Sequence, residues 1–121
     1  MTTSIHQAIT PFLSRRSIRK YEDRAVSDEQ VRALLEAAMA APSAVARDPW
    51  RFIVLRSREV RARVVEGLPH GQMLVPAGVG FVVCGELAAA HDQQLSYLMQ
   101  DCSAAIENML LAADSLGLGG V

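Results

Sequence analysis

The feature that most constrains the fold is a long apolar segment near the C-terminal end of the chain, residues 92–115. Its apolar residues recur at intervals of three and four, which predicts an α-helix. They are Leu95, Leu98, Met99, Cys102, Ala105, Ile106, Met109, Leu110 and Ala113. Further small apolar residues flank this stripe, so the helix must be buried in a core, in a subunit interface, or in both. Gly117 is expected to cap its C-terminal end, and residues 118–121 resemble the entrance to another strand.

Two helices are predicted in the first part of the chain. Residues 4–13 carry apolar side chains at helical spacing, which predicts an amphipathic helix with one buried stripe. Pro11 would lie in its last turn or kink it. Residues 27–41 predict a second helix, because Ser27 and Gln30 can form a capping box ahead of an apolar stripe. Its buried face is expected to consist of Val31, Leu34, Leu35, Ala38 and Met39.

Two short apolar runs rich in β-branched residues, 52–55 and 79–84, predict strands that are buried on both faces. A helix capped by Ser57 is expected between them. Two or three strands are few for a sheet that is covered on both faces. We therefore expect either that the chain is part of a longer protein or that a partner chain supplies the missing cover.

Length and composition indicate one domain. The chain has 121 residues, of which 50% are hydrophobic, enough for one core. Its 12 basic and 13 acidic residues give a net charge of −1, whereas a nucleic-acid surface needs a basic face spread over many phosphates. No apolar run reaches the ~18 residues that span a bilayer, and the N-terminus is too polar for a signal peptide. We expect a cytoplasmic protein without nucleic-acid or membrane partners.

The residue types that commonly bind metals are scattered along the chain. Cys84 and Cys102 lie in separate apolar segments and are expected to be buried free thiols. His6, His70 and His91 have no cysteine or carboxylate partner at the spacing of metal ligands. The sequence therefore predicts no metal site.

A cluster of cations lies near the N-terminus, in the stretch RRSIRKY at residues 15–21. Four cations and a serine hydroxyl within six residues suit an anion, because guanidinium groups match a phosphate monoester in charge and shape. Since the cluster is local, it favours a small phosphorylated ligand. The alternative is a solvated turn between two elements.

A second informative stretch is PSAVARDPW at residues 42–50. Its two prolines predict a loop, and its small residues allow a planar ligand to approach the backbone closely. Trp50 is the only tryptophan of the chain, and we expect a structural role for it, buried in the core or in an interface.

Three motifs occur in a fixed order along the chain. They are RRSIR at 15–19, PS at 42–43 with PWRF at 49–52, and a long Ala-rich helix that runs into GLG at 117–119. Together they resemble the N-terminal two thirds of the flavin-dependent nitroreductase family, with residues 1–121 forming one domain. The resemblance implies an α+β fold with a small central sheet flanked by helices. It also implies that the long helix lies at the interface of a homodimer, which holds one FMN in each of two pockets.

By this resemblance, four residues of the basic stretch would bind FMN. Arg15 and Ser17 would hold the phosphate, and Arg16 would contribute from its place in the same loop. Arg19 would reach toward the ribityl and pyrimidine side of the flavin.

The resemblance also implies that Pro42, Ser43 and Ala44 line the isoalloxazine ring, typically from the other subunit. The chain departs from the family pattern at Ala46 and Asp48, where many members carry Asn and Gln. The family's C-terminal part, which normally supplies a backbone donor near flavin N5 and a further basic residue for the phosphate, has no counterpart in this sequence.

The function implied by the resemblance is that of an FMN-dependent NAD(P)H oxidoreductase. It would reduce nitroaromatics, quinones or similar small-molecule acceptors by ping-pong hydride transfer at one site. The cofactor performs such chemistry, so no catalytic side chain is predicted. Two alternatives stay open, namely a non-catalytic flavin-binding or dimerisation remnant of such an enzyme, and a flavin-free structural remnant.

Overall fold

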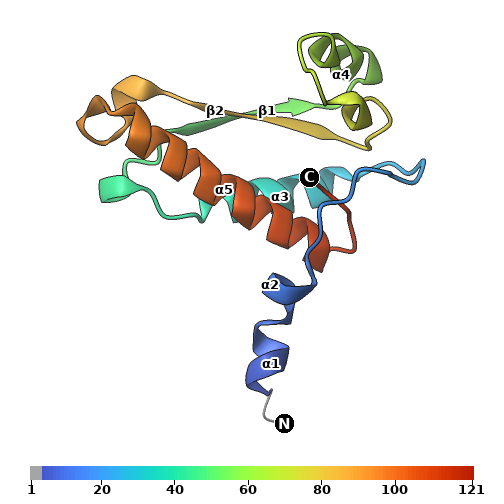
Figure 1. Cartoon of the computed structure of the whole chain (residues 1–121), viewed down its shortest axis with the longest axis horizontal. Helices are drawn as coiled ribbons and strands as arrows, with labels where there is room; N and C mark the ends of the chain where they lie inside the picture. Colours follow the sequence, from blue (N-terminus) through green and yellow to red (C-terminus); the bar gives the residue numbers. More distant parts are fainter. Residues whose placement is uncertain (1–3) are drawn as a thin grey trace.

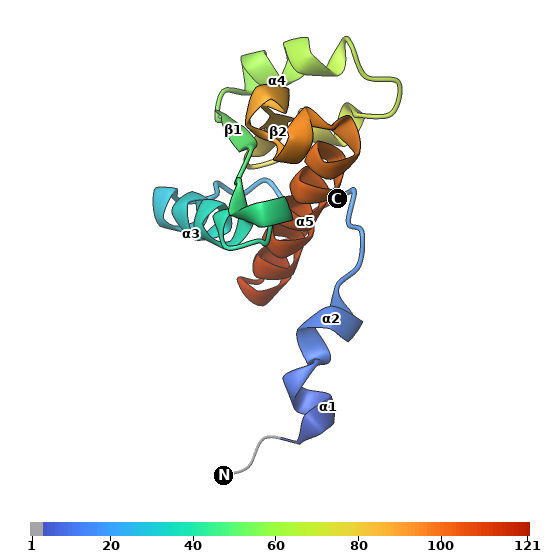
Figure 2. The ribbon, with the colours of Figure 1, turned by 90° about the vertical axis from the view of Figure 1, so that its left-hand side faces the viewer.

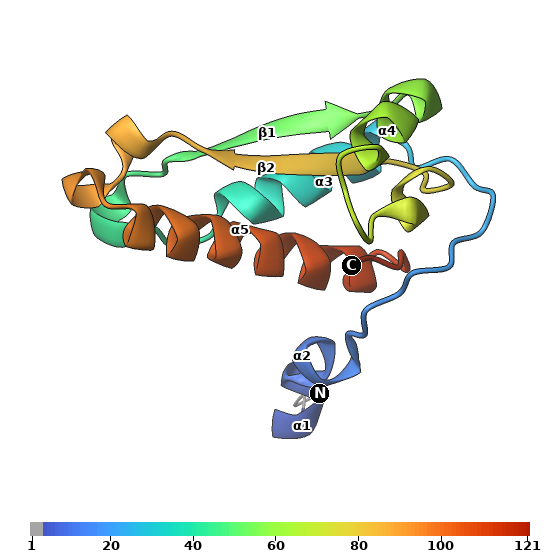
Figure 3. The ribbon, with the colours of Figure 1, turned by 45° about the horizontal axis from the view of Figure 1, so that its top comes forward.

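The computed structural model describes residues 4–121, which form a small antiparallel sheet packed on two helices (Figures 1 and 3). The helices and strands are α1 (Ile5–Ala8), α2 (Thr10–Ser14), α3 (Asp28–Met39), β1 (Trp50–Leu55), α4 (Arg58–Val65), β2 (Gly80–Gly85) and α5 (Leu95–Ser115). Helices α3 and α5 lie side by side beneath one face of the sheet, and α4 lies at one end of the strands. Helices α1 and α2 form an arm that projects from this body (Figure 2).

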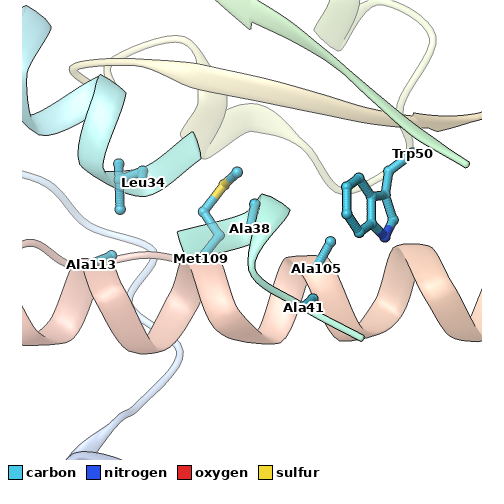
Figure 4. Close-up of a cluster of buried hydrophobic side chains, with 7 residues drawn as sticks. All are labelled: Leu34, Ala38, Ala41, Trp50, Ala105, Met109 and Ala113. Atoms are coloured by element: carbon cyan, nitrogen blue, oxygen red, sulfur yellow. The ribbon is translucent and has the colours of Figure 1, made fainter. Parts of the chain in front are cut away.

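The core lies where α3 and α5 cross under β1 (Figure 4). Ala38 of α3 and Ala105 of α5 are both 0% exposed, and such small side chains allow two helices to approach closely. The buried cluster around them also contains Leu34, Ala41, Trp50, Met109 and Ala113. The predicted burial of Trp50 is therefore confirmed.

Helix α3 forms as its sequence predicts. Ser27 accepts a hydrogen bond from the backbone N–H of Gln30, and the Gln30 side chain accepts one from the Ser27 N–H, which completes the capping box. Val31, Leu34 and Ala38 are buried on its inner face. The expectation for Met39 is wrong, because this side chain lies at the open end of the helix and is 52% exposed.

Helix α5 begins later than predicted, at Leu95 instead of Asp92. Asp92 and Gln93 have φ angles of 52° and 51°, in the left-handed region, so they form a separate turn that cannot continue into an α-helix. The predicted end is correct. Gly117 has a φ of 76°, and the Leu118 N–H donates to the Ala113 carbonyl at 2.8 Å, as in a Schellman motif.

The turn after α5 brings the end of the chain against the basic stretch. Ser17 and Gly120 form a parallel β-bridge, and the Ile18 N–H donates to the Gly120 carbonyl at 2.9 Å. The strand entrance expected at residues 118–121 is thus present as a single bridge.

The two strands pair antiparallel, with Trp50 opposite Gly85 and Leu55 opposite Gly80. The expectation that both faces of the sheet are buried is wrong, because Ile53 is 52% exposed. Helices α3 and α5 cover one face, whereas α4 reaches only the Leu55 end of the other. The middle of that second face has no cover within residues 4–121.

The expected helix at residues 4–13 is also different in the structure. The chain forms two short helices instead of one, and α2 carries Pro11 in its first turn, where the missing N–H leaves no hydrogen bond unmade. The apolar stripe is not buried, since Ile5 is 82% exposed. Neither short helix is long enough to cover the body, and Ser14 ties the arm to it by donating to Asp114 of α5 at 3.0 Å.

The two cysteines are free but only half-buried, so the expectation of full burial is not met. The Cys102 thiol lies 3.6 Å from the Cys84 carbonyl, to which it donates. Burial, followed by the nearby Asp101 and Cys84, raises the pKa of Cys102 above its ordinary value. No helix within residues 4–121 is long and apolar enough to cross a bilayer, and the same residues contain no group of three or more potential metal ligands.

The cap at Gly117 gives a direct test of the α5 terminus. An added methyl group at Gly117 would meet no atom within 4 Å, so Gly117→Ala changes only the backbone preference. We expect the free energy of unfolding to fall by about 1 kcal/mol, because an L-residue is disfavoured at this φ. Gly67→Ala is the matched control, since its only contact is an ordinary one at 3.7 Å, and it should change stability by less than about 0.5 kcal/mol in urea unfolding. Equal effects of the two substitutions would contradict the cap.

Candidate functional site

The basic stretch passes the C-terminal end of α5 (Figures 1 and 3). Arg15 is half-buried, and its Nε lies 3.5 Å from a carboxylate oxygen of Glu107 on α5. The β-bridge between Ser17 and Gly120 then fixes the backbone two residues later. These contacts hold the start of the stretch in place. They leave the Ser17 hydroxyl free to bind a ligand, because it makes no hydrogen bond within residues 4–121.

The other cations of this stretch remain accessible. One terminal nitrogen of Arg16 donates to the carbonyls of Leu13 at 2.7 Å and of Arg15 at 2.9 Å, which caps the C-terminal end of α2. Arg19 and Lys20 are exposed, and neither forms an ion pair in the described part of the chain, residues 4–121. The stretch therefore presents positive charge that no carboxylate of those residues neutralises beyond the Glu107 pair.

Tyr21 ends the basic stretch and is half-buried. Burial raises the pKa of its phenol, and the positive charge of Arg19 acts in the opposite direction. The phenol therefore stays neutral at physiological pH, and the charge of the stretch comes from its arginines and lysine alone.

The second predicted segment, residues 42–44, follows α3 at the other end of the body (Figure 1). The Ser43 hydroxyl donates to the Asp48 carboxylate at 2.7 Å and accepts from the Asp48 N–H at 2.8 Å, which closes a small loop. The Ala44 N–H donates to the Asp101 carboxylate of α5 at 2.9 Å. Pro42 is exposed at the start of this loop.

The loop that follows is strained. Val45, Ala46 and Asp48 have φ angles of 56°, 52° and 50°, although none of them is glycine. For Val45 and Ala46 this costs about 1–2 kcal/mol each relative to an ordinary backbone conformation, and for Asp48 less, because Asp tolerates this region. The surrounding contacts must offset this cost. They are the Ser43–Asp48 hydrogen bonds, the Ala44–Asp101 hydrogen bond and a hydrogen bond of 3.3 Å from the Arg51 side chain to the Asp48 carbonyl.

The structure does not bring the two predicted segments together within one chain. Arg15 is anchored at Glu107 and Ala44 at Asp101, and these two acidic residues lie about 9 Å apart along α5 and about 120° apart around it. One chain therefore presents the basic stretch and residues 42–44 as separate surfaces.

Sequence reasoning missed the residues that anchor these segments. Asp101, Glu107 and Gly120 were not predicted to take part in a site. For Asp101 a signal existed, because it lies at helical spacing from Leu98 and Ala105 on the buried face of α5. An acidic residue in such a position usually has a specific partner.

The structure also contains a shallow apolar groove of about 420 Å³ between the end of α3 and β1. Its walls are formed by Leu35, Met39, Asp48, Trp50, Arg51, Phe52 and Val54. None of the seven predicted site residues lines it. It borders the strained loop only through Asp48, so we do not assign the predicted site to it.

Comparison with known proteins identifies the family. A model of the Nitroreductase family matches residues 13–75. A relative from Archaeoglobus fulgidus, provisionally named NADH dehydrogenase/NAD(P)H nitroreductase, is 44% identical over 117 residues, which cover 97% of this chain and 67% of the relative. This chain belongs to the nitroreductase family. A nitroreductase relative of the same provisional name from Methanothermobacter thermautotrophicus is 47% identical over 108 residues, covering 89% of this chain and 56% of its own length.

A solved structure confirms the nitroreductase-like α+β fold. The crystal structure of a provisionally named nitroreductase from Desulfovibrio desulfuricans, in complex with FMN, superposes with a TM-score of 0.86 at 37% identity and covers 98% of this chain. The match covers 67% of that structure's chain. This nitroreductase chain thus spans between about half and two thirds of the length of the relatives compared.

Strain in the loop after residues 42–44 can be tested at Val45, whose side chain is exposed. Val45→Gly should raise the free energy of unfolding by up to about 1 kcal/mol, since glycine adopts this φ without steric cost but loses more entropy on folding. Val60→Gly, at an exposed helical position of α4, should lower it by about 1 kcal/mol. Urea unfolding measures both, and a clear loss of stability in Val45→Gly would show that the loop is unstrained.

Proposed function

We propose that this chain acts as an FMN-dependent NAD(P)H oxidoreductase that reduces nitroaromatics, quinones or similar small acceptors. The observation that carries the proposal is the basic stretch, which lies fixed against α5 while most of its positive charge stays unpaired within residues 4–121. Membership of the nitroreductase family and similarity to an FMN complex support it.

The residues of the basic stretch fit a phosphate monoester. Such a group carries nearly two negative charges and accepts several hydrogen bonds. Arg15 and Arg16 retain guanidinium N–H groups beyond those used in the fold, and the Ser17 hydroxyl is a further donor. Arg19 adds charge from the exposed continuation of the stretch. We assign Arg15, Arg16 and Ser17 to the phosphate and Arg19 to the ribityl and pyrimidine side.

Residues 42–44 would line the flavin ring from a second copy of the chain. Because they and the basic stretch are separate surfaces of one chain, we assign the two surfaces that contact one flavin to different copies in a homodimer. Exposed apolar side chains of α5 offer a surface for such pairing, among them Leu95, Met99 and Ile106. Apolar helix faces of this kind are typical of permanent dimer interfaces.

Bound FMN would supply the redox chemistry, taking hydride from NAD(P)H and passing it to an acceptor at the same face in a ping-pong exchange. The side chains of this chain would bind the cofactor and orient its ring. Pro42, Ser43 and Ala44 carry no bulky group that would block access to a planar ring. Arg19 would stabilise negative charge at the pyrimidine end. We propose no catalytic side chain and no metal, and we place the protein in the cytoplasm.

A second candidate is a non-catalytic flavin-binding or dimerisation protein. The observation that favours it is the exposed apolar surface of α5, formed by Leu95, Met99 and Ile106, which would serve pairing of two chains without any redox chemistry. A purified protein that holds FMN after dialysis, shown by absorbance near 450 nm, but does not oxidise NADH or NADPH with a quinone acceptor would select this candidate.

The phosphate assignment predicts a difference between FMN and riboflavin, which lacks the phosphate. Ser17→Ala should weaken FMN binding by about tenfold, the effect of losing one charge-assisted hydrogen bond, and leave riboflavin binding unchanged. Arg19→Ala should instead weaken the binding of both flavins to a similar extent, because Arg19 is assigned to the ribityl and pyrimidine side that they share. Flavin fluorescence titration measures both affinities. Arg58→Ala is the matched control, because Arg58 is also exposed and forms no ion pair within residues 4–121. Equal binding of FMN and riboflavin by the unmodified protein would contradict the assignment.

A further inference from the structure

Asp101 is an unusual residue on the buried face of α5. It is 4% exposed, and no cation pairs with it within residues 4–121. It lies one helical turn before Ala105, a member of the apolar core cluster. Burial of an unpaired carboxylate is costly by several kcal/mol. Its presence at this position therefore calls for a role that an apolar residue could not fill.

The contacts of Asp101 indicate that role. One carboxylate oxygen accepts the Ala44 N–H at 2.9 Å, which links positions 57 residues apart in the sequence. The other oxygen is buried and has no hydrogen-bond partner within residues 4–121. The indole N–H of Trp50 is likewise buried and unpartnered in that part of the chain, and its nitrogen faces α5 (Figure 4). The Ala44 amide is thus the only hydrogen-bond partner of the Asp101 carboxylate in that range.

The Ala44 amide lies where the loop enters its strained segment. It precedes the left-handed residues Val45 and Ala46, whose strain the surrounding contacts must offset. The Ser43–Asp48 hydrogen bonds close the loop on itself but do not attach it to another element. The hydrogen bond to Asp101 attaches it to α5, the most extensive element of the fold.

We propose that Asp101 is a positioning residue of the flavin site, whose carboxylate holds the Ala44 amide and thereby fixes the backbone that presents Ser43 and Ala44 to the ring. The flavin part of this inference rests on the function proposed above. The positioning of the loop does not, because it concerns contacts within this chain.

The first measurement uses the flavin-free protein. Hydrogen–deuterium exchange of residues 43–48 should become at least about tenfold faster in Asp101→Ala, because the loop loses its hydrogen bond to α5. Asp101→Asn should restore slow exchange, since its amide oxygen still accepts from Ala44. Asn108→Ala is the matched control, because Asn108 of α5 donates to the Ala37 carbonyl of α3 at 2.9 Å and forms no hydrogen bond with residues 43–48. Unchanged exchange in Asp101→Ala would overturn the inference, whether or not flavin binds.

The second measurement is the affinity for FMN and for riboflavin by fluorescence titration, with the visible absorption and circular dichroism of bound flavin. Asp101→Ala should weaken the binding of both flavins by at least about tenfold and alter the circular dichroism of the bound flavin. Both flavins are affected because they share the ring, whose contacts the loop provides, whereas the phosphate contacts are unchanged. Asp101→Asn should stay within about threefold of the unmodified protein, and Asn108→Ala should be unchanged. Normal flavin binding by Asp101→Ala would overturn the inference while leaving the proposed function intact. Absence of flavin binding in the unmodified protein would overturn the proposed function and the flavin role of Asp101, and leave only its role in the loop.

Discussion

The close contact between α3 and α5 is the interaction on which the rest of the structure depends. It is possible because α3 and α5 face each other with small side chains, among them Ala38 and Ala105, which are both fully buried in the core cluster. The sheet lies on the surface that the two helices form together, with Trp50 at the junction (Figure 4). A larger residue at either alanine would separate the helices and remove the support of β1.

Helix α5 also organises the parts of the chain that bear on function. Its three acidic residues each hold a different segment. Asp101 binds the loop after α3, Glu107 pairs with Arg15 of the basic stretch, and Asp114 accepts from Ser14 at the base of the arm. The turn at its end then delivers Gly120 to Ser17. One helix thereby determines where both proposed flavin-binding segments lie, although neither segment is part of it.

The chain leaves a large apolar surface uncovered. The arm carries Ile5 and Phe12, α5 carries Met99, and the outer face of the sheet carries Ile53, all with more than half of their surface exposed. Exposed apolar residues this numerous are characteristic of surfaces that pair with another polypeptide. The fold alone does not define an activity, so the function depends on the segments held by α5 and on what covers these surfaces.

The sequence by itself determined the local elements. The capping box of α3, the cap of α4 at Ser57, the end of α5 at Gly117 and the identity of both strands follow from neighbouring residues, because caps and periodicity act over a few positions. Only the tertiary structure decided which faces of the helices and of the sheet are covered. In it the apolar stripe of residues 4–13 is exposed and Asp101 is buried. It also decided that the basic stretch pairs with Gly120. These outcomes depend on contacts between residues far apart in the sequence, such as Ser14 with Asp114, which are 100 positions apart, and no local pattern encodes the energies of such contacts.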